Sequence, residues 1–158
     1  MQRRASLRKK DKEIKDNDLI EDIITRARVL RLGVFDGAYP YVVPMNFGYR
    51  EGSFYLHSAR EGKKIELLRT HPAVCVEIDL CDAIVEAPCA CQWTTRYQSI
   101  VGFGHARFIR DHAEKRQGLD LIMRHYSGRS AYEYPDEILE KVEVVCIHID
   151  RMTGKMSP

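Results

Sequence analysis

The sequence predicts one α+β domain built on an antiparallel, barrel-like sheet of about six short strands. Two observations lead to this class: stretches in which apolar and polar residues alternate recur along the chain, and tight turns join most of them. A chain of 158 residues with 44% hydrophobic residues can supply one core, since a domain of this size buries roughly 70% of the surface that its unfolded chain exposes. We therefore expect a single domain over residues 13–158, preceded by a flexible basic arm at residues 1–12.

The first half is predicted to open with a helix and to continue as a hairpin. Residues 16–18 (Asp-Asn-Asp) are N-cap candidates, and apolar residues recur at helical spacing through residues 19–27. The spacing then becomes that of a strand, and Asp36-Gly37 favours a tight turn. Strands are expected at residues 29–34, 41–43 and 53–59, and a short helix at residues 62–70 ends before His71-Pro72.

The second half is predicted to contain three strands and two helices. Apolar and polar residues alternate from Val74 to Leu80, as in a strand with one wet face. Residues 81–98 are expected to be irregular. A strand follows at residues 99–109, where Gly102 and Gly104 suggest a bend or a close backbone approach. A helix at residues 113–126, a short helix after Pro135 and a final apolar strand at residues 142–149 complete the domain.

Charge and cysteine content limit the classes of partner. The net charge is +2, but the first twelve residues carry six basic residues and one acidic residue, so the remaining body is slightly acidic. Such a body does not favour a general nucleic-acid binder, and the arm is typical of a solvated terminus, with a nucleic-acid or membrane contact as the alternative. No apolar run approaches the ~20 residues of a membrane span, and no signal peptide is recognisable. Five cysteines, an odd number without a disulfide pattern, favour reduced thiols and a cytoplasmic location.

A candidate anion site lies at the start of the helix predicted at residues 62–70. Gly62-Lys63-Lys64 would place two cations beside backbone amides that have no partner within the helix. Ser58 could add a hydroxyl donor, and a phosphate monoester would suit this set of donors. On its own, the triplet is more typical of a solvated lysine pair on a surface helix.

Three further segments carry groups suited to a cofactor. His57 could bind a phosphate or supply a proton, since its free pKa lies near neutrality; a histidine bonded to a backbone carbonyl is the alternative. Pro44, inside a strand, indicates an edge or a bulge where backbone groups are free to bind a ligand; an ordinary strand bend is the alternative, and the motif alone favours it. The aromatic and polar segment 93–99 could cover a flat ring or form a subunit interface. Cys89-x-Cys91 lacks the paired spacing of a zinc site.

Four segments in order carry a family resemblance: YPYVVPMNFGY at residues 39–49, FYLHSAREGKK at residues 54–64, TTRYQSIVGFG at residues 94–104 and TGK at residues 153–155. This order resembles the pyridoxamine 5'-phosphate oxidase-related flavoproteins, and among them it is most similar to the nitroimidazole-resistance (Nim) branch. The resemblance covers nearly all of the chain beyond the arm. It implies an FMN-binding split β-barrel of six strands with flanking helices, assembled as a homodimer with two flavin sites at the subunit interface.

The resemblance also assigns roles to individual residues. His57, Ser58, Lys63 and Lys64, with Gly62 opening the helix, would surround the FMN phosphate and ribityl chain. The segment from Val43 through Pro44 and Met45 to Asn46 would lie along the edge of the isoalloxazine ring. Four residues of the other subunit would close the site: Trp93, Arg96, Tyr97 and Ser99.

The expected activity follows from what the chain shares with this family and what it lacks. The arginine- and tryptophan-containing C-terminal segment of the true oxidases is missing, so oxidation of vitamin B6 is not expected. We instead expect an FMN-dependent oxidoreductase that reduces a small electron-poor acceptor, such as a nitroaromatic compound or a quinone, with His57 as first and Tyr97 as second candidate proton donor. One alternative is a non-catalytic flavin- or haem-binding protein in which a histidine such as His57 is a ligand. Another is a regulatory module that binds nucleic acid through its arm.

Overall fold

The structure is a computed structural model that describes residues 10–157. Its helices are α1 (Asn17–Arg26), α2 (Lys63–Thr70), α3 (His112–Ser127) and α4 (Asp136–Lys141), and two 3-10 turns cover Lys10–Lys12 and Ala90–Gln92. Its strands are β1 (Glu13–Ile14), β2 (Leu30–Phe35), β3 (Pro40–Met45), β4 (Gly48–Arg50), β5 (Ser53–Ala59), β6 (Ala73–Val85), β7 (Thr94–Ile109) and β8 (Val142–Ser157). The predicted α+β class is confirmed.

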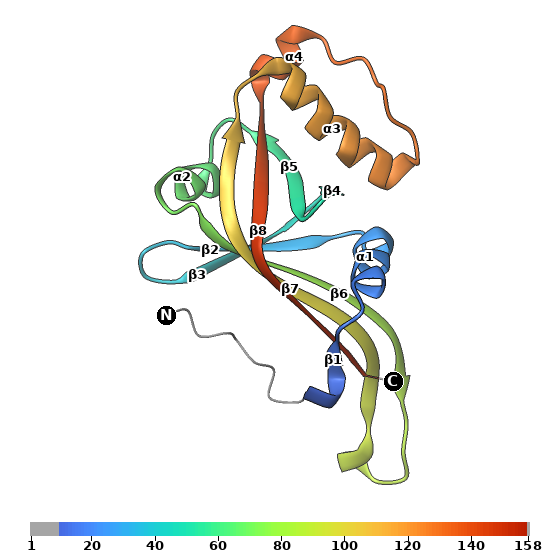
Figure 1. The fold of residues 1–158 in the computed structure, drawn as a ribbon. Coiled ribbons are helices and arrows are strands. Elements are labelled where there is room, and N and C mark those ends of the chain that lie inside the picture. The colour runs from blue at the N-terminus through green and yellow to red at the C-terminus, as the bar shows by residue number, and fades with distance from the viewer. Residues whose placement is uncertain (1–9, 158) are drawn as a thin grey trace.

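The strands form one open antiparallel sheet in the order β3-β2-β6-β7-β8-β5-β4, and β1 pairs with β8. The two ends of this order, β3 and β4, are joined in the chain by Asn46 and Phe47. The sheet therefore curls until its two edges meet at this short link, as a split barrel does. Figure 1 shows the long strands β6, β7 and β8 running through both the barrel and the hairpin that projects below it.

The long strands bend at a close backbone contact between β7 and β8. A Cβ atom on Gly104 would lie 1.9 Å from the carbonyl oxygen of His148, so only glycine fits there. The pairing shifts at the same place, since Phe103 is opposite Arg151 while Gly104 is opposite Ile149, which leaves Asp150 as an extra residue on β8. A bulge of this kind strengthens the local bend. The predicted close approach at Gly104 is confirmed.

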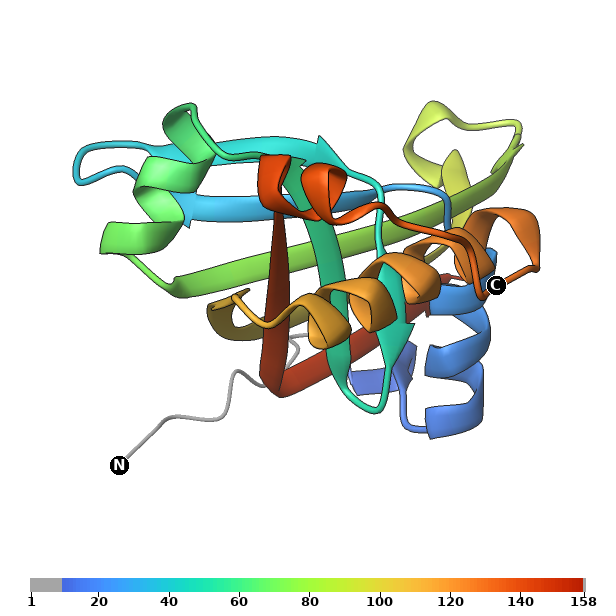
Figure 2. The same ribbon diagram turned by 90° about the horizontal axis from the view of Figure 1, so that it is seen from above.

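The core lies inside the curled sheet, and the outer face of the sheet is partly apolar as well. On β2, the inward side chains Leu30, Leu32 and Val34 are buried, whereas Arg31 and Phe35 point outward and are exposed. Helix α1 closes the core with buried Ile23 and Ile24. Helix α3 covers a second, smaller cluster on the other side of β5 and β8 (Figure 2).

The helices begin and end where local signals place them. The side chain of Asp16 caps α1 by accepting from the N–H of Asp18, and Asp111 caps α3 by accepting from the N–H of Glu114. Gly128, in the left-handed conformation, ends α3. The four predicted helices are confirmed within a few residues of the expected bounds. Within residues 10–157, no helix is long and apolar enough to cross a membrane.

Three sequence expectations differ from the structure. The described residues form eight strands rather than six, because the very short β1 and β4 gave no pattern. Residues 81–98, expected to be irregular, mostly continue β6 and begin β7 as a paired hairpin, and their outward side chains explain the missing alternation. The last strand extends to Ser157, past the expected end at residue 149. Residues 1–9 of the predicted arm lie outside the described residues, while Lys12 donates to Ser157 Oγ at 2.9 Å.

Candidate functional site

The short link between β5, which contains Ser58, and α2 places two lysines at the start of a helix. Gly62 is the N-cap of α2 and has a φ of 111°, a conformation that favours glycine. It lets the chain turn sharply, so that Lys63 and Lys64 stand in the first turn of α2 directly after the end of β5. The first amides of a helix have no partner within it and carry the positive end of the helix dipole. The local geometry therefore suits an anion.

Lys64 links α2 to β3 and β5. Its Nζ donates to Met45 Sδ at 3.1 Å, a neutral and weak acceptor, and partial burial lowers the pKa of the ammonium group. The pKa of His57 is also lowered, first by the removal of part of its ring from water and then by the charge of Lys64. His57 nevertheless remains exposed overall. A half-buried cation beside neutral partners would be stabilised by a bound anion.

Lys63 has a different partner from its neighbour. Its Nζ lies 2.9 Å from Asp36 Oδ2 in the β2–β3 turn and 4.9 Å from the centre of the Tyr41 ring. The pKa of Asp36 is lowered to about 2, first by a hydrogen bond from the N–H of Tyr39 and then by Lys63. An ionised Asp36 already balances the charge of Lys63. Lys64 donates to a neutral sulfur instead, so its charge is better placed to bind an anionic ligand.

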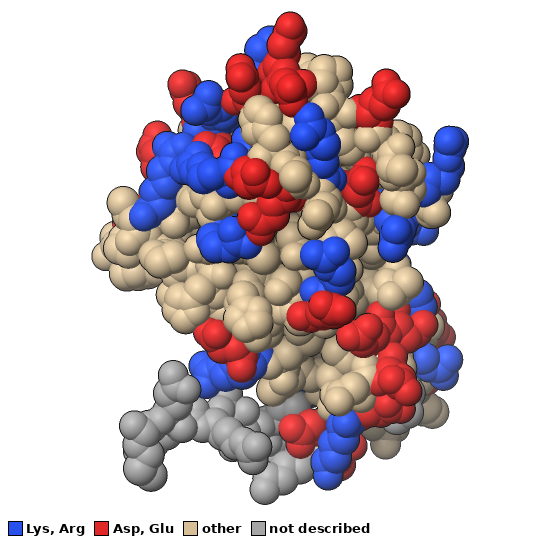
Figure 3. All heavy atoms as spheres, turned by 45° about the horizontal axis from the view of Figure 1, so that its top comes forward, with Lys and Arg blue, Asp and Glu red and all other residues tan. Residues whose placement is uncertain are grey.

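A buried carboxylate fixes the far end of α2. Glu143 of β8 is 1% exposed, and its Oε1 accepts hydrogen bonds from Arg69 of α2 and from Arg110, each at 3.2 Å. The two guanidinium groups also each lie 5.5 Å from the centre of the Phe108 ring. Figure 3 shows Lys and Arg side chains gathered on the side of the molecule that carries α2, with acidic side chains between them. The ion pair between Arg69 and Glu143 ties α2 to β8.

Residues 43–46 lie at an edge of the sheet. They belong to β3 and to the link that follows it, and β3 is the last strand in the order of the sheet. The edge position expected from Pro44 is therefore confirmed. Val43 packs against the core, Met45 is buried, and Asn46 is exposed. The segment meets α2 through the contact between Met45 and Lys64, so the first two predicted motifs converge in one chain.

The third motif lies elsewhere. Trp93, Arg96, Tyr97 and Ser99 belong to the distal hairpin, the name used here for residues 81–99, which lies at the opposite end of the molecule from α2 in both ribbon views (Figures 1 and 2). Trp93 is 49% exposed, and its Nε1–H donates to the carbonyl oxygen of Ala87 at 2.7 Å. The ammonium of Lys155 lies 5.6 Å from the centre of the Tyr97 ring. One chain thus does not bring these residues to the start of α2.

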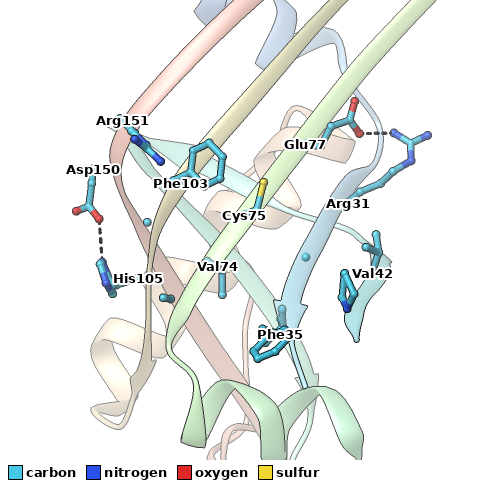
Figure 4. Close-up of a pocket in the computed structure, with 15 residues that line it drawn as sticks. Arg31, Phe35, Val42, Val74, Cys75, Glu77, Phe103, His105, Asp150 and Arg151 are labelled. Atoms are coloured by element: carbon cyan, nitrogen blue, oxygen red, sulfur yellow. Dashed lines mark hydrogen bonds and ion pairs between the residues drawn. The ribbon is translucent and has the colours of Figure 1, made fainter. Parts of the chain in front are cut away.

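A hollow of about 770 Å³ occupies the outer face of the sheet (Figure 4). Phe35, Val42 and Phe103 give it an apolar floor and rim. At one end Arg31 pairs with Glu77 at 3.0 Å, and at the other His105 pairs with Asp150 at 2.8 Å. None of the predicted cofactor residues lines this hollow.

Sequence reasoning missed two of these features, although signals for both were present. Phe35 and Val42 occupy outward positions of β2 and β3, so the outward face of each strand carries a large apolar residue, as in strands that are covered on both sides. Glu143 is a lone carboxylate inside the apolar run of β8. A charge in such a run indicates a buried ion pair, but its partners could not be named from the sequence.

Comparisons with known proteins place the chain among its relatives. A family model described as pyridoxamine 5'-phosphate oxidase matches residues 16–156. The crystal structure of a putative 5-nitroimidazole antibiotic resistance protein from Bacteroides thetaiotaomicron VPI-5482 is 41% identical in sequence and has a TM-score of 0.82; the match covers 90% of this chain and 85% of that one. No curated protein matches the sequence.

Two more distant structures share the fold. The flavocytochrome Anf3 from Azotobacter vinelandii has a TM-score of 0.83 at 22% identity, over 97% of this chain and 72% of its own. The FAD and haem binding protein from Mycobacterium smegmatis has a TM-score of 0.82 at 19% identity, over 92% of this chain and 73% of its own. The family model spans nearly the whole described chain and the 41% identical structure supports it, so this protein belongs to the pyridoxamine 5'-phosphate oxidase family.

Proposed function

We propose that this protein binds FMN and acts as a flavin-dependent oxidoreductase that reduces a small, flat, electron-poor acceptor such as a nitroaromatic compound or a quinone. The observation that carries the proposal is the α2 corner, defined as Met45, Asn46, His57, Ser58, Gly62, Lys63 and Lys64. There a half-buried ammonium with a neutral acceptor stands at the start of a helix. Membership of a family whose proteins include flavin binders supports it.

The α2 corner fits the phosphate end of FMN. Burial disfavours the charged form of Lys64, and a bound phosphate would stabilise that charge. The first amides of α2 add hydrogen-bond donors, and Ser58 near the end of β5 adds a hydroxyl group. Lys63 contributes less, because Asp36 already pairs with it. The exposed edge at Pro44 and Asn46 leaves backbone and amide groups for the polar rim of the ring.

When bound, FMN would supply the redox chemistry, and the residues of the chain would position it and manage protons. The charge of Lys64 acts on His57, so a ligand held by Lys64 would lie within reach of the imidazole, which can then hydrogen-bond it and hand a proton to a reduced acceptor. Its lowered pKa keeps it largely neutral near pH 7 until a bound phosphate raises that pKa. Tyr97 of the distal hairpin is the second candidate donor.

The proposal includes a homodimer, because one chain keeps the α2 corner and the distal hairpin apart. The outer face of the sheet supports this: Phe35 and Val42 are 52% and 58% exposed, and such patches mark interaction sites. A two-fold axis would bring the same outer face of both copies together. In that dimer Trp93, Arg96, Tyr97 and Ser99 would close the partner's site.

The proposal also includes a cytoplasmic location, because five free thiols suit a reducing compartment.

The first test is the visible absorption spectrum of the purified protein and of the ligand released from it. A flavin spectrum, with a released ligand that phosphatase converts to riboflavin, supports FMN. Steady-state reduction of a nitroaromatic or quinone with NADH or NADPH then tests the enzymatic part. A haem Soret band instead of a flavin spectrum would favour the haem-binding alternative. Protein that carries no flavin and does not bind added FMN would contradict the proposal.

A further inference from the structure

Cys89 and Cys91 face each other at the end of the distal hairpin. Their Sγ atoms are 3.0 Å apart, and both residues are exposed. The backbone holds them in this arrangement, because Cys89 is the N-cap of the 3-10 turn Ala90–Gln92 and its carbonyl oxygen accepts from the N–H of Gln92 at 2.9 Å. The pair is therefore a built feature of the turn.

The distance between the sulfur atoms favours a direct bond over a shared metal ion. Two thiolates on a tetrahedral zinc ion, each about 2.3 Å from the metal, lie roughly 3.7 Å apart. A disulfide requires about 2.05 Å between the sulfur atoms. At 3.0 Å the two atoms are already closer than a metal would hold them, and an approach of about 1 Å forms the bond.

The thiols of the chain differ in reactivity. The pKa of Cys89 is lowered, first by a hydrogen bond from the Cys91 thiol and then by the backbone N–H of Cys91. Cys75 lies on β6, where burial and the charge of Glu77 raise its pKa, and Cys146 is buried under α3. Because the thiolate is the nucleophile in disulfide exchange, Cys89 is better suited to attack than either of these two.

We propose that Cys89 and Cys91 form a reversible disulfide, which makes the end of the distal hairpin a redox-sensitive site that reacts with small disulfides such as oxidised glutathione. The Cys89 thiolate attacks one sulfur of the oxidant and releases one thiolate. The Cys91 thiolate then attacks Cys89 Sγ in the mixed disulfide and releases the second. The protein loses two electrons and two protons, and the oxidant leaves as two thiols.

The single tryptophan is a built-in reporter for this step. Trp93 directly follows the 3-10 turn, and its N–H donates to the carbonyl oxygen of Ala90 at 3.2 Å while its ring N–H donates to Ala87. Closing a ring between residues 89 and 91 changes the turn to which Trp93 is bonded. The fluorescence emission of Trp93 should therefore change when Cys89 and Cys91 form a disulfide.

The experiment equilibrates the full-length protein in glutathione buffers of increasing oxidised fraction and counts free thiols after acid quenching and unfolding. The wild-type count should fall from five, the number in the sequence, by two, with no glutathione retained by mass and with a change in Trp93 emission at the same midpoint. Cys89→Ser and Cys91→Ser should abolish both changes. Cys81→Ser, which alters another exposed thiol of the same hairpin, should keep them.

Three outcomes would overturn the proposal: a count that stays at five, a protein that accumulates one bound glutathione, or a loss of two thiols that persists in Cys91→Ser. The thiol count and the mass, which decide these outcomes, do not depend on flavin. The redox site and the proposed flavin function can therefore fail independently.

Discussion

The α2 corner and the distal hairpin are the two halves of the predicted site, and the fold treats them differently. In the α2 corner, side chains from β3, β5 and α2 meet within one chain, and Glu143 ties α2 to the sheet from behind. In the distal hairpin, Trp93 and Arg96 project from a two-stranded ribbon and are exposed. The difference teaches that one chain is enough to place two lysines at the start of a helix beside β3, whereas the exposed aromatic half needs another surface to act on.

The largest effect, on stability, is expected at the ion pairs of Glu143 that hold α2 against the sheet. Replacing both Arg69 and Arg110 by Met leaves Glu143 buried without a partner and should lower the free energy of unfolding by about 3 kcal/mol or more. Glu143→Gln should cost only about 1 kcal/mol, because the two arginines are themselves exposed and can be hydrated.

Urea denaturation measures both values. Arg107→Met is the matched control: it breaks an exposed pair with Glu114 and should change stability by less than about 1 kcal/mol. If Glu143→Gln destabilised as much as the double arginine variant, the carboxylate would matter for reasons other than its ion pairs.

The next effect compares the two lysines of the α2 corner. Lys64→Ala should weaken FMN binding by about 10- to 100-fold, since it removes a charge-assisted contact worth about 1.5–3 kcal/mol. Lys63→Ala should weaken it by less than about fivefold, because Asp36 already balances that charge. Fluorescence titration with FMN measures both, and riboflavin, which lacks the phosphate, is the control ligand. Equal losses in the two variants would contradict the division of roles.

Mixed dimers test whether the two halves act across subunits. A Lys64→Ala chain and a chain with Trp93→Ala and Arg96→Ala should each bind FMN poorly alone. Unfolded together and refolded, they should regain up to about a quarter of the sites, because each mixed dimer contains one site with both halves intact. Flavin per chain after desalting measures this. No recovery, in a mixture shown by mass to contain mixed dimers, would mean that both halves serve the same chain or that the distal hairpin does not bind flavin.

The smallest effect concerns pH. The pKa of His57 lies below its ordinary value of 6.5 in the free protein, and a bound phosphate would raise it. A group whose pKa rises on binding takes up a proton, so FMN affinity should increase as pH falls from 8 to 6, by about three- to tenfold. His57→Gln should remove this part of the dependence and leave only the titration of the phosphate itself. The same slope in both proteins would exclude His57 from the site.

Features that depend on neighbours in the chain could be predicted from the sequence, whereas contacts between distant segments could not. Asp16, Asp111 and Gly128 act on neighbours in the chain, so the helices they delimit could be predicted from short windows. The glycine and two lysines of α2 are contiguous and were found in the same way. The pairing of Lys63 with Asp36 and of Lys64 with Met45 joins segments that are distant in the chain, so it could not be predicted. This pairing nevertheless decides which of the two lysines lacks an acidic partner in these contacts and is therefore better suited to bind an anion.

The sequence by itself determined the class of the fold, the order of its four helices and six of its strands, and the residue types of both halves of the candidate site, because periodicity, caps and turns depend on near neighbours. Tertiary structure alone decided that Glu143 is buried between two arginines, that an apolar hollow covers the outer face of the sheet, and that the distal hairpin stands away from α2. These features depend on strand register and on the bend at Gly104. Register and curvature arise from packing across the whole sheet, which no local pattern specifies.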